Sequence, residues 1–300
     1  MDTMSFVSSF KLNGCLVRFV SITHLDEIRE KIESLRQEGL LAESVYQDYL
    51  SSFKYRKPAS LTRAKSIAVV AVPQPQIRVT FHWQSKPMPV VIPPTYIDVI
   101  KINRRLRSLL KERLGSNYRF VRAALPFKYL AVRSGLAQYG LNNITYIPKY
   151  GSFHRLTAFF TDYVSEDHWQ EPRILEECNA CRKCIKACPT GAMTEKRFLL
   201  KAERCLTYLN EKPAEEVFPD WVKPSWHNAI IGCMICQRVC PYNRDILNWY
   251  EDRGEFSQAE TTYLLSGKYT GRNAARINRK LRRAGLDLSS FPRNLQALLR

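Results

Sequence analysis

The sequence CNACRKCIKACPTGAM, from Cys178 to Met193, decides the fold of this chain because it sets four cysteines in the spacing Cys-x2-Cys-x2-Cys-x3-Cys-Pro. A second string, CMICQRVCPYN, runs from Cys233 to Asn243 with the spacing Cys-x2-Cys-x3-Cys-Pro. Three cysteines at such short spacings can converge on one iron–sulfur cube, while the fourth is carried away by a helical turn that proline stops. The two strings therefore predict a module that holds two metal clusters.

The second string lacks one ligand, since Ile230 stands three residues before its first cysteine, where the first string has a cysteine. Cys205, within ERCLTYLN, can supply that ligand from elsewhere in the loop. In two-cluster proteins with the first spacing, the fourth cysteine ligates the other cluster. The predicted ligands of the first [4Fe–4S] cluster are Cys178, Cys181, Cys184 and Cys240. The predicted ligands of the second are Cys188, Cys205, Cys233 and Cys236.

Structural zinc and disulfides are the alternative uses of these cysteines. Zinc sites usually carry pairs of Cys-x2-Cys motifs, whereas the x2-x2-x3 spacing before Cys-Pro is a cluster spacing. Disulfides need an oxidising compartment, and the first residues show neither a basic region before an apolar stretch nor a twin arginine. We therefore expect a cytoplasmic protein with no membrane span, in which Cys15 is a buried thiol on a strand.

Positive charge is concentrated in two segments of the 300-residue chain, whose formal net charge is +18. One is KINRRLRSLLKER, residues 101–113, and the other covers residues 272–300. Such stripes suit nucleic acid, and they equally suit an acidic electron donor such as ferredoxin or flavodoxin. A solvated helix face is the third interpretation, and charge patterning alone does not choose among the three.

The order of apolar patterns predicts an α+β fold. Residues 1–170 form an α/β domain, residues 171–246 the cluster module, and residues 247–300 a basic, mainly helical segment. Within the first domain, Thr23-x-x-Asp26 predicts a capping box at the start of a helix that Gly39 ends. The further elements are a strand or hairpin at 5–22, a buried strand at 66–72, an alternating strand at 77–83, a helix over the first basic stripe, a short helix at 126–134 and a strand at 152–164.

After the short helix come GLAQYGLNN, residues 135–143, and a strand that begins at Gly151-Ser152. Together with the cysteine plan, this order resembles the epoxyqueuosine reductase family, which is related to the reductive dehalogenases. The resemblance extends from about Leu25 to Asn243. It implies a nitroreductase-like domain that binds cobalamin and receives electrons from two [4Fe–4S] clusters.

The resemblance also implies residues near the cobalamin. They are Arg56, Tyr96, Asn142, Thr145, Gly151, Ser152, Leu156 and Thr207. Arg56 could meet the phosphate of the nucleotide tail, and Thr207 would lie between the second cluster and the cofactor. Ordinary packing is an equally weighted role for Tyr96 and Leu156.

One departure from the family concerns the proton donor. The family's donor is an Asp, but FVRAALPFKYLAVRSG replaces that region here, and no carboxylate occurs between Phe120 and Tyr150. General acid catalysis needs a positioned donor, so Tyr96 and Tyr129 are the predicted substitutes. Tyrosine suits a weakly basic leaving group poorly. We therefore predict a cobalamin-dependent iron–sulfur oxidoreductase that reduces a small molecule, and that does not reduce epoxyqueuosine in tRNA at the family's rate.

Two other functions remain open at this point. An electron-transfer protein with no substrate of its own could deliver electrons to an acidic partner, for example a corrinoid protein. A tRNA-acting reductase could instead use the basic C-terminal residues to bind nucleic acid.

Overall fold

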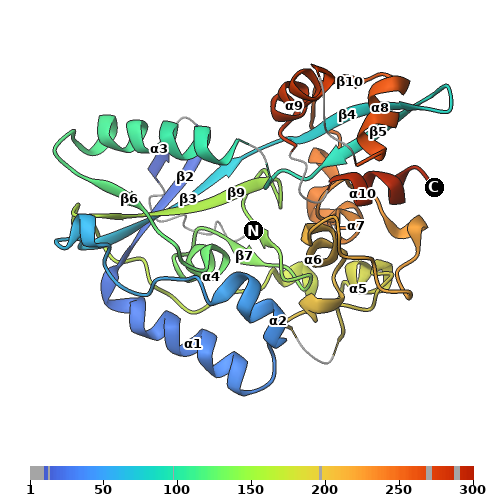
Figure 1. Ribbon diagram of the computed structural model, residues 1–300. Helices are drawn as coiled ribbons and strands as arrows, with labels where there is room; N and C mark the ends of the chain where they lie inside the picture. Colours follow the sequence, from blue (N-terminus) through green and yellow to red (C-terminus); the bar gives the residue numbers. More distant parts are fainter. Residues whose placement is uncertain (1–9, 13, 97, 196–197, 268–271, 287–290) are drawn as a thin grey trace. The chain divides into compact units, whose positions relative to one another are not determined.

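The computed structural model describes residues 10–12, 14–96, 98–195, 198–267, 272–286 and 291–300. The chain divides into two compact units, one made of residues 1–73 with 99–181 and the other of residues 74–98 with 182–300 (Figure 1). Residues 74–98 lie within the segment that the sequence assigns to the first domain, yet their contacts are with the cluster-bearing half. The architecture is a mixture of α and β elements, as the sequence predicts.

The first unit is built on a sheet whose described strands follow the order β1-β2-β3-β9-β6, with each neighbouring pair antiparallel. Their bounds are β1 Phe10–Leu12, β2 Cys15–Ser21, β3 Ser66–Pro73, β6 Phe120–Arg122 and β9 His154–Thr161. β7 (Gln138–Tyr139) and β8 (Thr145–Tyr146) form a separate short ribbon. Of the strand or hairpin predicted at 5–22, β1 and β2 form a hairpin, and residues 5–9 and 13 lie outside the described residues.

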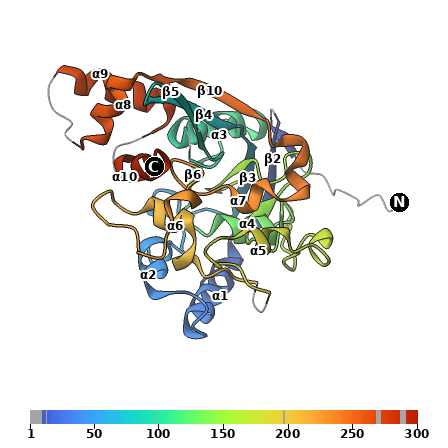
Figure 2. The same ribbon diagram turned by 90° about the vertical axis from the view of Figure 1, so that its right-hand side faces the viewer.

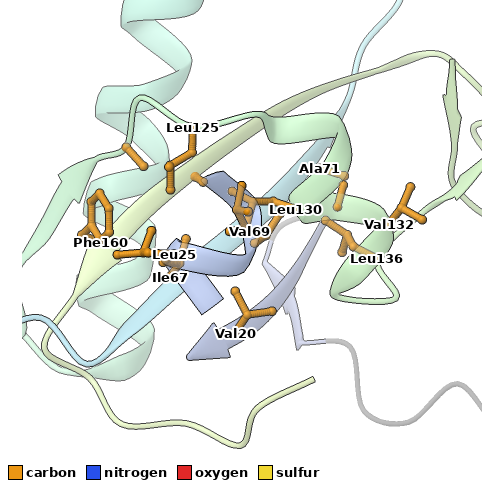
Figure 3. Close-up of a cluster of buried hydrophobic side chains, with 14 of the residues drawn as sticks. Val20, Leu25, Ile67, Val69, Ala71, Leu125, Leu130, Val132, Leu136 and Phe160 are labelled. Atoms are coloured by element: carbon orange, nitrogen blue, oxygen red, sulfur yellow. The ribbon is translucent and has the colours of Figure 1, made fainter. Parts of the chain in front are cut away.

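Helices cover both faces of this sheet. α1 (Leu25–Gln37) and α4 (Phe127–Arg133) pack on one face and α3 (Val99–Leu114) on the other, while α2 (Glu43–Val45) is a single short turn after α1. Strand β3 is buried from Ser66 to Ala71, so the prediction of a strand buried on both faces is confirmed. Ile67 and Val69 pack into the cluster shared with Leu25 and Leu130 (Figure 3). On the opposite face, Ala68 and Val70 pack with Leu106 and Leu110 of α3, and the buried Cys15 belongs to the same cluster.

The predicted capping box at Thr23 and Asp26 is wrong. A 3₁₀ turn, Ile22–His24, precedes α1, and the side chain of Ser21 caps that turn by accepting a hydrogen bond from the Thr23 amide. Helix α1 then begins without a side-chain cap. The turn places Thr23 inside a helical segment, and its hydroxyl donates to the Ser21 hydroxyl at 2.8 Å instead of accepting from an open amide of α1.

The second unit contains a smaller sheet of described strands in the order β10-β4-β5. Their bounds are β4 Gln76–Trp83, β5 Lys86–Ile92 and β10 Tyr250–Phe256. β4 and β5 form an antiparallel hairpin, and Ile77, Val79 and Phe81 are buried on one face of β4, as the alternation predicts. β10 runs parallel to β4 and is a strand that the prediction of a mainly helical C-terminal segment missed.

Helices complete the second unit. They are α5 Lys183–Ala187, α6 Leu206–Glu211, α7 Ile235–Arg238, α8 Gln258–Leu265, α9 Arg272–Ala284 and α10 Phe291–Leu298. Both views show α8 and α9 beside the small sheet (Figures 1 and 2). Phe81, Phe256 and Phe291 join these elements in one buried cluster. Across the described ranges, no helix has the length and apolar character that crossing a bilayer requires.

Candidate iron–sulfur site

Cysteines from three separate segments come together in the second unit. Burial raises the pKa of the Cys236 thiol well above its usual value, and the nearby thiols of Cys233, Cys205, Cys184 and Cys188 raise it further. Like charges have this effect only over a short distance, so these four thiols lie near the Cys236 thiol. All four predicted ligands of the second cluster belong to this group.

The chain repeats one local shape at both Cys-Pro positions. α5 carries Cys184 and ends at Ala187, and the next residue, Cys188, is extended (φ −72°, ψ 109°) before its proline. α7 carries Cys236, and Cys240 is likewise extended (φ −75°, ψ 121°) before Pro241. Proline disfavours helical backbone in the residue before it. The last cysteine of each string therefore leaves the helix that carries the cysteine before it, as the spacing predicts.

Hydrogen-bond donors surround the sulfurs of the second predicted set. Asn228 donates its side-chain amide to the Cys233 sulfur at 3.3 Å and accepts from the Met234 amide at 2.8 Å. Burial raises the pKa of the Cys205 thiol, while hydrogen bonds from Thr207 oppose this shift. Donors of this kind stabilise thiolate over thiol. Thr207, predicted as a cofactor contact, thus bonds to a predicted cluster ligand.

The donor set fits iron–sulfur clusters. The predicted cluster cysteines are free thiols and partly exposed, and Cys178 and Cys181 stand at the end of the first unit. In the described part of the chain, no three His, Cys, Asp or Glu side chains converge tightly enough to hold a single metal ion. A four-iron cube is larger than one ion and holds its thiolates further apart than zinc bonds of about 2.3 Å permit.

The predicted cobalamin contacts Asn142 and Thr145 lie in a buried polar network of the first unit. Asn142 donates to the Tyr146 hydroxyl at 2.8 Å and accepts from the Ile144 amide at 3.2 Å. Thr145 bonds to Nε2 of His154 at 3.0 Å, and the other ring nitrogen bonds to the Gly151 carbonyl. Burial lowers the pKa of His154 to about 4, so the ring is neutral and Nε2 accepts from the Thr145 hydroxyl. The side-chain polar groups of Asn142 and Thr145 thus already form hydrogen bonds within the protein.

The remaining predicted contacts of the first unit differ in exposure. Gly151 has a φ of 46°, and its carbonyl accepts from the Ile147 amide at 2.9 Å. Ser152 is buried and Arg56 is exposed. Leu156 is partly buried and packs against the core cluster that contains Leu25 of α1 and Leu130 of α4. The exposed guanidinium of Arg56 is the group best placed to meet an outside phosphate.

Tyr129, one of the predicted proton donors, is held by the first unit's core. Its ring meets Trp169 edge-on at 6.2 Å, and Arg133 donates to its hydroxyl at 3.3 Å. Burial raises the pKa of Tyr129 although Arg133 lowers it. A phenol with a raised pKa is a weaker acid than an ordinary tyrosine, so Tyr129 suits proton donation less than the sequence predicts.

Tyr96, the other predicted donor, has a carboxylate partner that the sequence analysis missed. Its hydroxyl donates a hydrogen bond to Glu211, the last residue of α6. The two residues are separated by 115 positions and both belong to the second unit. No spacing rule links residues so far apart. The sequence offered one signal for Glu211, which is its position shortly after Cys205, a predicted cluster ligand.

Comparisons with known proteins agree with this arrangement. Residues 177–243 match the family described as a 4Fe-4S double cluster binding domain. The chain is 27% identical over 261 residues to the epoxyqueuosine reductase of Bacillus subtilis, an alignment that covers 78% of this chain and 64% of that protein. The chain therefore spans less than two thirds of the length of this relative.

Solved structures show the same fold. The epoxyqueuosine reductase from Streptococcus thermophilus superposes with a TM-score of 0.64 at 21% identity, over 94% of this chain and 76% of that one. An epoxyqueuosine reductase with an epoxyqueuosine-modified tRNA-Tyr stem loop gives a TM-score of 0.62 at 21% identity, over the same shares. The resemblance seen in the sequence is thus confirmed: this chain is similar in sequence and in fold to the epoxyqueuosine reductases, and it carries a double [4Fe–4S] cluster binding segment.

Proposed function

We propose that this chain is an iron–sulfur oxidoreductase that reduces epoxyqueuosine in tRNA. The observation that carries the proposal is the double-cluster segment at residues 177–243, set in a fold that matches epoxyqueuosine reductases over 94% of the chain. This proposal takes the place of the small molecule expected from the sequence. That expectation rested on the missing carboxylate, and Glu211 supplies a carboxylate beside Tyr96.

The second predicted cluster has the better-supported ligand set. When bound, a [4Fe–4S] cluster passes electrons one at a time. The thiols of Cys188, Cys205, Cys233 and Cys236 would hold it. Asn228 and Thr207 donate toward two of these sulfurs, and such hydrogen bonds stabilise the more negative, reduced state. An acidic ferredoxin or flavodoxin is the proposed source of the electrons.

Cobalamin, which the resemblance implies, fits the first unit only in part. When bound, it would supply a cobalt centre that exchanges electrons singly. Arg56 is exposed and suits its tail phosphate, whereas Asn142 and Thr145 already bond within the protein. We therefore propose Arg56 as the contact of its tail phosphate.

Exposed basic helix faces support tRNA as the substrate. In α9, Ile277, Leu281 and Ala284 are buried, which leaves Arg279 and Arg282 on the exposed face. In α3, the exposed cations are Lys101, Arg104, Arg105, Arg107 and Arg113. Because phosphates dominate the affinity of proteins for nucleic acid, each face matches an RNA backbone.

Anaerobic conversion of a defined substrate tests this function. Protein with both clusters would be reduced and incubated with a tRNA stem loop that carries epoxyqueuosine, with and without added cobalamin, and the nucleosides would be analysed by mass spectrometry. We expect loss of the epoxide oxygen from the stem loop. An unmodified stem loop controls for background. Conversion of the free nucleoside alone would instead favour the small-molecule reductase, and no conversion of either substrate would overturn the proposal.

A further inference from the structure

A tyrosine and a glutamate form a linked pair beside the cluster cysteines of the second unit. The Tyr96 hydroxyl donates a hydrogen bond to the carboxylate of Glu211. Both side chains are partly exposed, so solvent reaches the pair. α6, which ends at Glu211, begins directly after Cys205. The pair is therefore connected to a predicted cluster ligand by one short helix.

The backbone under the tyrosine ring has no side chain of its own. Gly232 precedes Cys233 and has a φ of 69°, a left-handed conformation that glycine adopts without strain. A Cβ atom at this position would lie 2.7 Å from the Tyr96 hydroxyl oxygen and 2.8 Å from a ring carbon. The ring thus rests directly on the chain next to a predicted cluster ligand.

Buried amides fix this backbone. Asn210 donates to the Gly232 carbonyl at 2.7 Å. Asn294 donates to the carbonyls of Asn210, at 2.7 Å, and Ile230, at 2.9 Å. Both asparagines are fully buried. A hydroxyl held on such a support needs little reorganisation before it acts, which is the property that a positioned proton donor requires.

We propose that Tyr96 and Glu211 form the proton-delivery pair of this reductase, with Tyr96 as the group that touches the substrate oxygen and Glu211 as a positioning residue that restores its proton. The inference rests on the proposed function. Removal of an epoxide oxygen as water takes two electrons, supplied through the clusters, and two protons. As the carbon–oxygen bond breaks, the Tyr96 O–H bond breaks and the proton joins the substrate oxygen. The step starts from a Glu211 carboxyl that solvent has protonated: its O–H bond breaks to restore the phenol, which leaves the carboxylate that accepts the Tyr96 hydrogen bond in the structure. The second proton of the water that forms also comes from solvent.

A carboxyl solves the chemical problem that a lone tyrosine leaves. The ordinary pKa of a phenol is near 10 and that of a glutamate side chain near 4.3. A phenol that loses its proton to a weakly basic oxygen forms a costly anion. Coupled transfer from a carboxyl places the negative charge on the weaker base instead. Glu211 thus performs, from α6, the task for which residues 120–150 hold no carboxylate.

Steady-state kinetics with matched variants test the pair. Tyr96→Phe and Glu211→Gln remove one proton each, Glu211→Asp keeps the carboxyl, and Glu215→Gln removes an exposed acid of the same region as a control. All would be compared at equal iron content with the stem-loop substrate. We expect Tyr96→Phe and Glu211→Gln to lower kcat about 100-fold with KM within about twofold. The double variant should be no slower than either single one, because the two residues act as a unit.

Two further readouts separate proton delivery from a structural role. The solvent deuterium isotope effect on kcat should rise in Glu211→Gln, and Glu211→Asp should recover part of the rate. Wild-type kcat in Glu211→Gln, a loss confined to KM, or a loss of iron that parallels the loss of rate would each overturn the inference. Wild-type protein that converts nothing would refute the proposed function, and the inference would fall with it. If the wild-type protein is active and Glu211→Gln leaves kcat unchanged, the inference alone is refuted.

Discussion

Replacing Gly232 by alanine should destabilise the second unit through contact with one identified side chain. At a φ of 69°, an alanine costs about 1–2 kcal/mol relative to glycine. Its Cβ would also meet the Tyr96 hydroxyl at 2.7 Å. The ring can move away only by giving up its hydrogen bond to Glu211, which contributes about 1.5–3 kcal/mol for a charged partner. We therefore expect Gly232→Ala to lower the free energy of unfolding by about 3–4 kcal/mol in total.

Gly191 provides a matched control. Its φ of 62° is almost the same, but no atom of the described residues lies within 4 Å of a Cβ built there. Gly191→Ala should therefore cost only the backbone strain, about 1–2 kcal/mol. Thermal unfolding under anaerobic conditions, with clusters intact and at one scan rate, measures both variants. At about 2 °C per kcal/mol for a chain of this size, we expect a fall in Tm of about 3 °C for Gly191→Ala and about 7 °C for Gly232→Ala.

A double-mutant cycle identifies Tyr96 as the cause of the excess. In a Tyr96→Ala background the crowding is gone, so the cost of Gly232→Ala should fall to that of Gly191→Ala. If Gly232→Ala costs the same with and without the tyrosine ring, the close packing of Tyr96 on Gly232 is wrong. The proton-delivery pair would then lose its structural support as well.

Three further predictions concern separate parts of the molecule. Cys205→Ala should reduce iron from about eight to about four atoms per chain, because one of two cubes loses a ligand; unchanged iron and spectra would refute the assignment. Glu260, which is 5% exposed, bonds to Lys280 at 2.7 Å, and despite burial its ion pairs and hydrogen bonds lower its pKa. Glu260→Gln should therefore lower the free energy of unfolding by about 2 kcal/mol at neutral pH, and the difference from wild type should shrink as acid protonates the carboxylate. Urea unfolding at several pH values measures this difference, and a difference that does not change with pH would contradict the prediction. Arg282→Glu should weaken binding of the stem loop, more so at low salt than at high salt, whereas Arg29→Gln on α1 should not; equal effects of the two in a titration would argue against α9 as a phosphate-binding face.

Local signals in the sequence predicted the parts of the structure that depend on neighbouring residues. The unbroken apolar run from Ser66 identified β3, because a strand buried on both faces has no polar side. Each Cys-Pro dipeptide identified a point where the chain leaves a helix, since proline restricts the residue before it. Both inferences need only a few consecutive positions.

Features that depend on distant residues were not predictable in this way. β10 has the sequence YEDRGEF, which lacks apolar alternation, and it forms a strand because β4 offers it an edge and Arg78 offers Asp252 an ion pair. The partnership of Tyr96 with Glu211 likewise joins two segments that no motif connects. The error at Thr23 has a smaller cause, since a single 3₁₀ turn moved the start of α1.

The parallel pairing of β10 with β4 also constrains how the chain is made. Arg78 and Asp252, which face each other across this ladder, are 174 residues apart. A ribosome that adds about 5–20 residues per second needs on the order of 9–35 s to cover that distance. During this interval β4 has emerged and can pair with β5 along one edge. The other edge of β4, which later pairs with β10, has no partner, and the apolar side chains of Ile77, Val79 and Phe81 lie on the same strand. Nascent β4 is therefore an exposed edge strand, and we expect chaperones that bind extended apolar segments to protect it until residues 250–256 are synthesised.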